Sequence, residues 1–321
     1  MNTVWFACIT SKSVGLGHLS RCIALAEEFN SRRSQVCFSH GSRIDSRGIE
    51  LMNQSGFSTD CSCNGTPTII VGDSYDSNFL EDVFSLKNCT KLLLVDDISP
   101  LIFADFYIEA SPISKWIPLN KFASVLKFEK SPLLRQKFDK PISTDFYRKD
   151  PSKFLISLGA AKEHFSIVES ILRVIRMTFL PNYSVTLIIS ESDIANFQQL
   201  NNSYELTTIT KTTDLSGLAA HHDFVISGGG VTAWEFISLG IPGFLIGVVE
   251  NQREQLNYIG GKNLRNCVFY ESGSQLEREI GNLFSLEKLS SFATSGHNFL
   301  RNGRIQAVNW IESFSHPHQT N

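Results

Sequence analysis

The chain has no run of about 18 consecutive apolar residues, which is the length a membrane-spanning helix needs. Its N-terminal segment lacks the charged region and the long apolar stretch of a secretory signal peptide. The 29 Lys and Arg residues against 32 Asp and Glu residues leave a net charge of −3, so the basic excess of a nucleic-acid-binding protein is missing. These absences predict a cytoplasmic protein that neither inserts stably into a membrane nor binds nucleic acid.

Paired cysteines are missing as well. The seven cysteines are odd in number and scattered along the chain. Cys61 and Cys63 stand too close together for the usual zinc-binding pair, and no second pair follows. Free thiols in a reducing compartment are therefore expected, and neither a metal site nor another cofactor is predicted.

The amino-acid composition is typical of a soluble globular protein, with 42% apolar and 19% charged residues. Short apolar runs with the length of buried parallel strands alternate with helical patterns in both halves. The pattern predicts an α/β protein with two doubly wound, Rossmann-like domains, 1–135 and 153–300, facing each other across a cleft. A proline-rich, charged segment at 136–152 is the expected linker, and 301–321 is the expected C-terminal helix and tail. The expected strands are 4–9, 35–39, 68–72, 92–95, 106–109, 153–158, 185–189, 205–209, 224–226, 244–249 and 267–270.

The stretch 223–258 carries the most specific pattern. Its first apolar run is followed by three glycines and by a helix that ends at Gly240. A strand, a glycine turn and a helix in this order direct free backbone N–H groups and the positive end of a helix dipole at an anion. The pattern predicts a nucleotide-diphosphate cradle, but tight turns and close helix packing also use glycines, and both interpretations stay open. The cradle residues are Gly228, Gly229, Gly230, Val231 and Thr232.

Three polar side chains accompany this cradle. Glu235 lies one or two turns into the helix, where it could bind a ribose hydroxyl or simply place a favourable charge near the helix N-terminus. Asn251 and Gln252 follow the next strand, at the sheet edge where nucleotides bind in such folds. They could equally serve as a helix cap.

The first half presents a second group of polar residues at a sheet edge. A loop containing Gly15 and Gly17 follows the first strand and leads to His18 at the start of a helix. Arg21 lies one turn later and can share a face with His18. A helix-capping histidine and a solvated arginine are the alternative interpretation.

Other polar residues follow neighbouring strands of the same predicted sheet. Asp73 and Tyr75 come after the strand 68–72, and Asp96 and Asp97 come after the strand 92–95. Because parallel strands end at the same edge, these side chains are expected on one rim with the histidine, and such rims are often functional. The Asp96–Asp97 pair could also cap only the following turn.

These motifs, taken in order over nearly the whole chain, resemble the UDP-2,4-diacetamido-2,4,6-trideoxy-β-L-altropyranose hydrolase family of pseudaminic acid biosynthesis. That family is similar to the UDP-GlcNAc transferase of the peptidoglycan pathway. The resemblance therefore implies a glycosyltransferase-B (GT-B) fold and a UDP-sugar as the small-molecule substrate. The matching segments are Gly15-x-Gly17-His18-x-x-Arg21-Cys22-x-x-Leu25-Ala26, Asp73-x-Tyr75, Asp96-Asp97, Gly229-Gly230-x-Thr232-x-Trp234-Glu235, Leu239-Gly240-x-Pro242, Glu250-Asn251-Gln252 and Asn302-Gly303-Arg304.

The resemblance implies a role for each matched residue. Members of the family release UDP from the nucleotide sugar, and His18 matches the histidine that activates water for attack at the anomeric carbon. Tyr75 and Asn251 match the other catalytic positions, at the sugar end of the site. The implied substrate-binding residues are Gly15, Gly17, Arg21, Asp73, Gly228, Gly229, Gly230, Val231, Thr232, Glu235 and Gln252.

One segment departs from the family pattern. A Gly-Gly-Ser-Asp type loop is replaced by Gly159-Ala160-Ala161-Lys162, and Lys162 could pair with a phosphate or remain solvated. The alternative function is a GT-B glycosyltransferase that uses a UDP-sugar donor and an unknown acceptor, with His18 deprotonating the acceptor hydroxyl. A third option is a nucleotide-sugar-binding protein without turnover.

A lipid-linked acceptor would require a membrane-docking patch. The segment with Trp116, Ile117, Leu119 and Phe122, flanked by lysines, could form one. Packing of this segment in the core is the favoured expectation.

Overall fold

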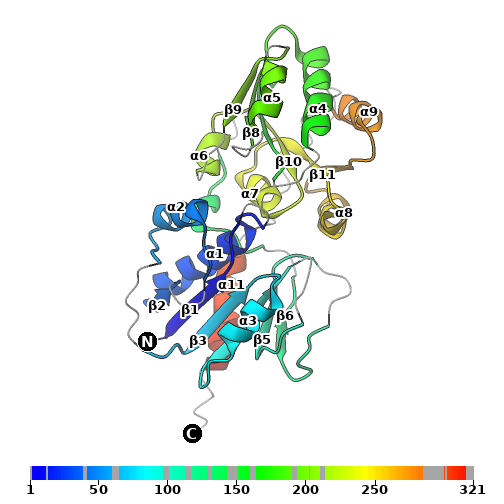
Figure 1. The fold of residues 1–321 in the computed structure, drawn as a ribbon. Helices are drawn as coiled ribbons and strands as arrows, with labels where there is room; N and C mark the ends of the chain where they lie inside the picture. Colours follow the sequence, from blue (N-terminus) through cyan, green and yellow to red (C-terminus); the bar gives the residue numbers. More distant parts are fainter. Residues whose placement is uncertain are drawn as a thin grey trace. The chain divides into compact units, whose positions relative to one another are not determined.

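Two compact units make up the chain: Met1–Gln136 with Leu300–Asn321, and Lys137–Phe299. Each unit is built around one sheet of six parallel strands (Figure 1). The expectation of an α/β chain with two doubly wound layers is confirmed. The structure, a computed structural model, describes residues 2–11, 14–38, 42–59, 65–96, 101–112, 117–128, 132–142, 151–159, 164–189, 194–201, 203–209, 214–284, 300 and 302–315.

The sheet of the first unit has the strand order β2-β1-β3-β4-β5-β6. Its inner strands are continuous apolar runs and are almost fully buried, as expected for a parallel sheet with both faces covered. The sixth strand, β6, was not predicted, because three half-buried residues at a sheet edge leave no apolar run. The strands are β1 (Thr3–Cys8), β2 (Gln35–Cys37), β3 (Ile69–Asp73), β4 (Thr90–Val95), β5 (Phe106–Glu109) and β6 (Ser124–Leu126).

The helices of the first unit include one from the far end of the sequence. Helices α2 and α3 start at Asp45 and Asp76, whose carboxylates accept hydrogen bonds from backbone N–H groups of the first turn. Helix α11 packs against α1, and its Trp310 and Phe314 rings lie 5.6 and 4.9 Å from the ring of Phe106. The C-terminal helix thereby completes the core of the N-terminal unit. The helices are α1 (Gly17–Ser31), α2 (Ser46–Gln54), α3 (Ser77–Phe84) and α11 (Gly303–Ser315). A short 3₁₀ helix, η1 (Gln136–Phe138), contains the sequence position at which the chain passes from the first unit to the second.

The sheet of the second unit has the strand order β12-β11-β10-β7-β8-β9. Its core contains a cluster of phenylalanine rings whose centroids lie 5.0 to 6.0 Å apart, contributed by Phe154, Phe179, Phe224, Phe244 and Phe284. The strands are β7 (Lys153–Ser157), β8 (Ser184–Ile188), β9 (Leu206–Ile209), β10 (Phe224–Gly228), β11 (Gly243–Gly247) and β12 (Asn266–Phe269).

Helix α7 is buried along most of its length. Its residues from Ala233 to Leu239 are all buried, which matches its apolar character on every side. It stops at Gly240, whose φ of 72° lies in the left-handed region that favours glycine. The helices here are α4 (His164–Phe179), α5 (Ile194–Asn201), α6 (Leu215–Ala219), α7 (Val231–Leu239), η4 (Glu250–Gln252), α8 (Arg253–Gly261) and α9 (Gly273–Leu283).

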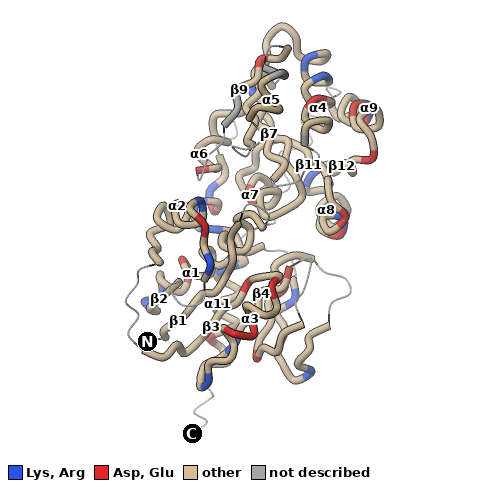
Figure 2. The backbone as a smooth tube through the Cα atoms, in the orientation of Figure 1, with Lys and Arg blue, Asp and Glu red and all other residues tan. Residues whose placement is uncertain are grey.

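The segment considered as a membrane-docking patch is not packed in the core. Ile117 is 79% exposed and Phe122 is 98% exposed, so the expectation of core packing was wrong for these residues. Trp116 lies outside the described residues. Within the described part of the chain, no helix is long and apolar enough to cross a membrane. Figure 2 shows both signs of charge interspersed over the described parts of both units.

Candidate functional site

The first unit gathers its polar residues where β1, β3 and β4 end, because these parallel strands are neighbours in the sheet. The loop after β1 is closed by a hydrogen bond from Gly15 N to Ser11 O of 2.8 Å. Gly15 has a φ of 79°, a left-handed conformation that disfavours other residues. Helix α1 then starts at Gly17, which puts His18 in its first turn.

Four side chains from α1, β3 and the end of β4 form one hydrogen-bonded group, which we call the His18 cluster: His18, Arg21, Asp73 and Asp96. His18 Nδ1 lies 2.5 Å from Asp73 Oδ1. Arg21 donates to both oxygens of Asp73, from Nε to Oδ2 over 2.8 Å and from Nη2 to Oδ1 over 3.0 Å. Its remaining nitrogen, Nη1, donates to Asp96. The guanidinium therefore bridges two carboxylates with strong, charge-assisted bonds.

Burial and charge act against each other in the His18 cluster. His18, Arg21 and Asp73 are 3%, 3% and 1% exposed. Burial alone would raise the pKa of the Asp73 carboxyl, but the charge of Arg21, together with His18, holds it below its usual value. Burial likewise opposes the charge on Arg21, yet Asp73 and Asp96 raise the pKa of its guanidinium well above the usual value. Asp73 is therefore ionised and Arg21 charged at neutral pH.

These charge states assign the tautomer of His18. An ionised carboxylate can only accept hydrogen bonds, so Nδ1 of His18 carries a proton and donates it to Asp73. Arg21 Nη2 lies 2.9 Å from the same Nδ1, because both donors converge on Asp73 Oδ1. The lone pair of the neutral imidazole is then on Nε2. His18 is thus held in the form that accepts a proton on Nε2.

Tyr75 lies beside the imidazole. Its ring meets the His18 ring edge to face, with the centroids 4.4 Å apart and the planes at 79°. At 38% exposure it is much more open than the cluster behind it. Tyr75 and His18 are therefore neighbours, as the shared rim predicted.

The three glycines after β10 serve different purposes. A Cβ on Gly228 would lie 2.6 Å from the carbonyl oxygen of Leu158, and one on Gly229 would lie 3.0 Å from Leu256. Close packing therefore requires the first glycine and favours the second. A Cβ on Gly230 would meet nothing within 4 Å, so only Gly230 leaves open space over the backbone.

Helix α7 begins directly after this open position. Gly230 is its N-cap and has no side chain with which to satisfy the first N–H groups. Gln255 fixes the turn by donating from Nε2 to Gly230 O over 3.0 Å. Val231 and Thr232 open the helix. An uncapped helix start with clear space above its backbone fits a phosphate group well.

The three polar residues expected around the cradle differ in burial and in their contacts. Glu235 is 4% exposed, so it is buried at its position in α7. Gln252 accepts a hydrogen bond from Val248 N over 3.0 Å, which fastens the loop after β11. Asn251 is exposed at the end of the same loop. Of the segment that departs from the family pattern, Gly159 is described, whereas Lys162 and its two neighbouring alanines lie outside the described residues, as does Asp97.

The structure adds two residues to the predicted set. Asp96 was expected on the rim but not in the site, and its link to Arg21 is visible only in three dimensions. Gln255 carried no sequence signal beyond being a polar residue on the buried face of a helix. Among the described residues, no group of three or more His, Cys, Asp and Glu side chains could hold a metal ion.

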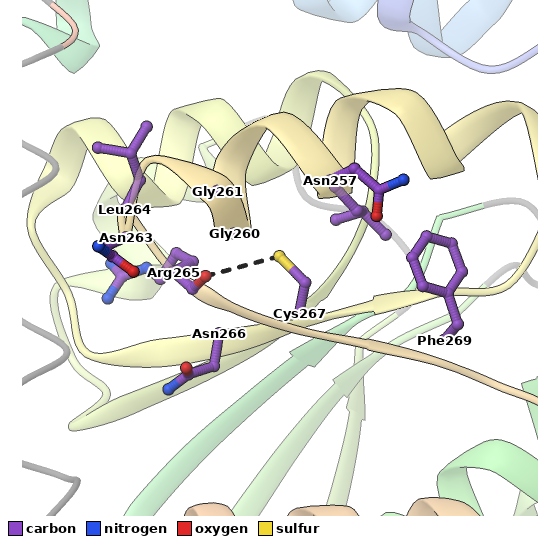
Figure 3. Close-up of a pocket in the computed structure, with 10 residues that line it drawn as sticks. Asn257, Gly260, Gly261, Asn263, Leu264, Arg265, Asn266, Cys267 and Phe269 are labelled. Atoms are coloured by element: carbon purple, nitrogen blue, oxygen red, sulfur yellow. Dashed lines mark hydrogen bonds between the residues drawn. The ribbon is translucent and has the colours of Figure 1, made fainter.

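A pocket of about 580 Å³ lies elsewhere in the second unit, between α8 and β12 (Figure 3). Asn257, Asn263 and Asn266 are among its lining residues. Cys267 also lines it, and burial raises the pKa of this thiol to about 12, so it stays protonated at neutral pH. None of the predicted site residues lines this pocket.

Comparisons with known proteins identify the fold. No protein-family model and no curated protein matches the sequence. Among solved structures, MurG of Acinetobacter baumannii matches with 12% identity and a TM-score of 0.62, covering 97% of this chain and 99% of that chain. MnaA of S. aureus, in a structure with UDP, matches with 9% identity and a TM-score of 0.67, covering 98% and 97%. The spinosyn rhamnosyltransferase SpnG matches with 12% identity and a TM-score of 0.59, covering 97% and 100%.

These matches extend over essentially the full length of this chain and of the matched chains. Together with the two six-stranded parallel sheets, they confirm the expected GT-B fold. At 9 to 12% identity, the likeness concerns the fold and not the chemistry.

Proposed function

We propose that the protein is a GT-B glycosyltransferase that uses a UDP-sugar donor, with His18 as the general base toward the hydroxyl group of an acceptor. The observation that supports this most directly is the pairing of His18 Nδ1 with the ionised Asp73, because it leaves Nε2 as the proton acceptor. In the reaction, Nε2 takes the hydroxyl proton and the acceptor oxygen forms a bond to the anomeric carbon. The bond from that carbon to the β-phosphate oxygen breaks, and UDP leaves with the electron pair.

Asp73 has two roles in this scheme. Its hydrogen bond keeps the imidazole in the tautomer with the lone pair on Nε2, and its negative charge stabilises the imidazolium once the proton has moved. Both roles require Asp73 to remain a carboxylate, which the paired Arg21 ensures. The arrangement is that of a general base and the carboxylate that orients it, and not that of a surface ion pair.

The UDP would bind at the start of α7. The backbone N–H groups of Val231 and Thr232, the space over Gly230 and the positive end of the helix dipole offer the charge and shape that a diphosphate needs. They would also stabilise the negative charge that develops on the departing UDP. The matched MnaA structure, which contains UDP, supports a uridine nucleotide.

A transferase is preferred because one full-length structural match is named as a rhamnosyltransferase. A second candidate is the hydrolysis of UDP-2,4-diacetamido-2,4,6-trideoxy-β-L-altrose, in which water replaces the acceptor. It is supported by the resemblance of the His18, Arg21 and Asp73-x-Tyr75 motifs, and by the contact of Tyr75 with the His18 ring. The same base serves both reactions, so only the acceptor distinguishes them.

The test is the release of UDP from a panel of UDP-sugars, including UDP-GlcNAc and the altrose nucleotide. Each donor is offered alone, with a polar metabolite extract and with a lipid extract, against an enzyme-free control. A transferase releases UDP only when an extract supplies the acceptor, whereas a hydrolase releases it from the donor alone. UDP binding by calorimetry, with no release under any condition, would contradict both reactions and indicate a binding protein.

A further inference from the structure

We propose that Asp96 is a positioning residue that acts through Arg21 to make the His18 cluster electrically neutral when His18 carries the proton taken from the acceptor. The inference depends on the proposed function only for the source of that proton. It concerns a carboxylate that neither the motifs nor the general-base scheme requires.

The contacts of Arg21 define the position of Asp96. Nε and Nη2 of the guanidinium hold the two oxygens of Asp73, and Nη1 holds Oδ2 of Asp96. Asp96 therefore contacts a different nitrogen of Arg21 from those that hold Asp73, and it influences His18 through the guanidinium. Its side chain is 17% exposed, compared with 4% for Arg21, so it lies at the rim of an otherwise buried cluster.

The charges of the cluster show what Asp96 contributes. With neutral His18, the two carboxylates and one guanidinium sum to one negative charge, and protonation of His18 brings the sum to zero. Without Asp96, the cluster would be neutral beforehand and would carry a net positive charge after the proton transfer. A net charge is costly to hold in a buried site, so Asp96 favours the imidazolium that the reaction forms.

No other charged group described at the cluster provides this balance. Tyr75 faces the imidazole from the loop after β3, and a phenol is neutral near pH 7. Cys22 of α1 lies close to Arg21 and Asp73, and burial, with its hydrogen bond to Cys8 of β1, raises the pKa of the Cys22 thiol well above its usual value. These neighbours therefore stay uncharged while His18 titrates.

The test replaces the charge of Asp96 while keeping its shape. Asp96→Asn retains an oxygen that can accept from Arg21, Asp96→Glu retains the charge, and Asp82→Asn removes an exposed acid from α3 of the same unit as a matched control. The titration of the His18 ring is followed by NMR in the full-length protein, and His18→Gln identifies its signal. The pH profile of kcat/KM for UDP release is recorded in parallel.

In Asp96→Asn, we expect the His18 ring to take up its proton at a pH about 1 unit lower than in the wild type, the lower end of the effect of one nearby charge. The acidic limb of the kcat/KM profile should move in the same direction. Asp96→Glu and Asp82→Asn should titrate like the wild type. Thermal melts establish that each variant is folded, and Asp96→Ser, which also removes the charge, replaces the amide variant if that variant does not fold.

A folded Asp96→Asn whose His18 ring titrates like that of the wild type would overturn the inference, as would an Asp96→Glu that titrates as if the charge were missing. The NMR result is independent of turnover. A wild-type protein that releases no UDP would therefore refute the proposed function while leaving the role of Asp96 to be decided by the titration.

Discussion

At the sheet edge of the first unit the candidate functional groups are side chains, whereas at the corresponding edge of the second unit they are backbone N–H groups. The first edge holds His18, Arg21 and Asp73, all nearly inaccessible and bonded to one another. The second edge holds Gly230 with clear space above it and the uncapped start of α7. A proton-transfer group needs a fixed orientation and fixed charges, which packed side chains supply. An anion cradle needs exposed N–H groups, which the removal of side chains supplies.

The two edges also differ in how their charges are stabilised. The His18 cluster removes two carboxylates and a guanidinium largely from water, so its charges are tolerated only because each is paired and hydrogen-bonded. The ion pair after β11, between Glu250 and Arg253, is solvent-exposed, and such pairs contribute little. Removing one partner of the His18 cluster is therefore expected to lower the unfolding free energy strongly, whereas removing one partner of the Glu250–Arg253 pair is not.

The largest predicted effect is that of Asp73→Ala. Removing this carboxylate leaves Arg21 buried without its main partner, and breaking a buried pair in this way typically costs about 3–5 kcal/mol of unfolding free energy. Denaturant unfolding followed by circular dichroism measures the loss. Asp82→Ala, which removes an exposed acid from the same unit, should change the unfolding free energy by less than about 0.5 kcal/mol. Equal stability of the two variants would contradict the buried-cluster description.

The pH dependence of the same pair sharpens this prediction. Arg21 and His18 hold the pKa of Asp73 below its usual value in the folded protein, so ionised Asp73 stabilises the fold above its unfolded-state pKa of about 3.9. That stabilisation is lost as the pH falls through the folded-state pKa. The stability difference between wild type and Asp73→Ala should therefore shrink as the pH falls below about 4. A difference that grew as the pH fell below about 4 would contradict the assigned charge state.

The next prediction separates the glycines of the second edge. Gly228→Ala places a methyl group against the Leu158 carbonyl, and such overpacking should cost about 1–3 kcal/mol of unfolding free energy. Gly230→Ala should leave stability within about 0.5 kcal/mol but weaken UDP binding, measured by calorimetry, because its methyl group would occupy the cradle. Equal effects of the two changes on stability, or unchanged UDP affinity in Gly230→Ala, would remove the distinction between packing and binding glycines.

The smallest effect is expected from Glu250→Gln. The partner, Arg253, donates to Glu250 over 2.7 Å, but both groups are solvent-exposed and the side chains can pair with water instead. No change should be detected in thermal or denaturant unfolding. A clear destabilisation would show that charges at the second edge matter as much as those of the His18 cluster.

Much of the fold was predictable because each inner strand is a local apolar run between loops. Strand β5, for example, has the bounds that the sequence indicated, Phe106–Glu109. Strand β6 could not be found, because its pairing with β5 depends on a neighbour and not on its own composition. The packing of α11 against the first unit could not be predicted either, because Trp310 and Phe314 contact Phe106, which lies about two hundred positions away in the sequence.

The candidate site was predictable to the extent that its contacts are local or follow from strand order. The spacing of His18 and Arg21 indicated a shared helix face, and the order of β1, β3 and β4 brings Asp73 and Asp96 to the same edge. The sequence could not show that Nε, Nη1 and Nη2 of Arg21 all donate to carboxylates of the cluster, and the substrate-binding role of Arg21 that the resemblance implied stays a prediction. Nor could it show that Gly228 is required by the Leu158 carbonyl, because that contact arises from strand pairing.

The most direct test of His18 as the base compares UDP release by the wild type and by His18→Ala, using the donor and acceptor conditions that support wild-type turnover. Removal of a general base predicts a fall in kcat of about 10²-fold or more, with UDP affinity by calorimetry and the thermal melt close to those of the wild type. A folded His18→Ala that binds UDP and turns over at the wild-type rate would contradict the assignment of His18 as the base.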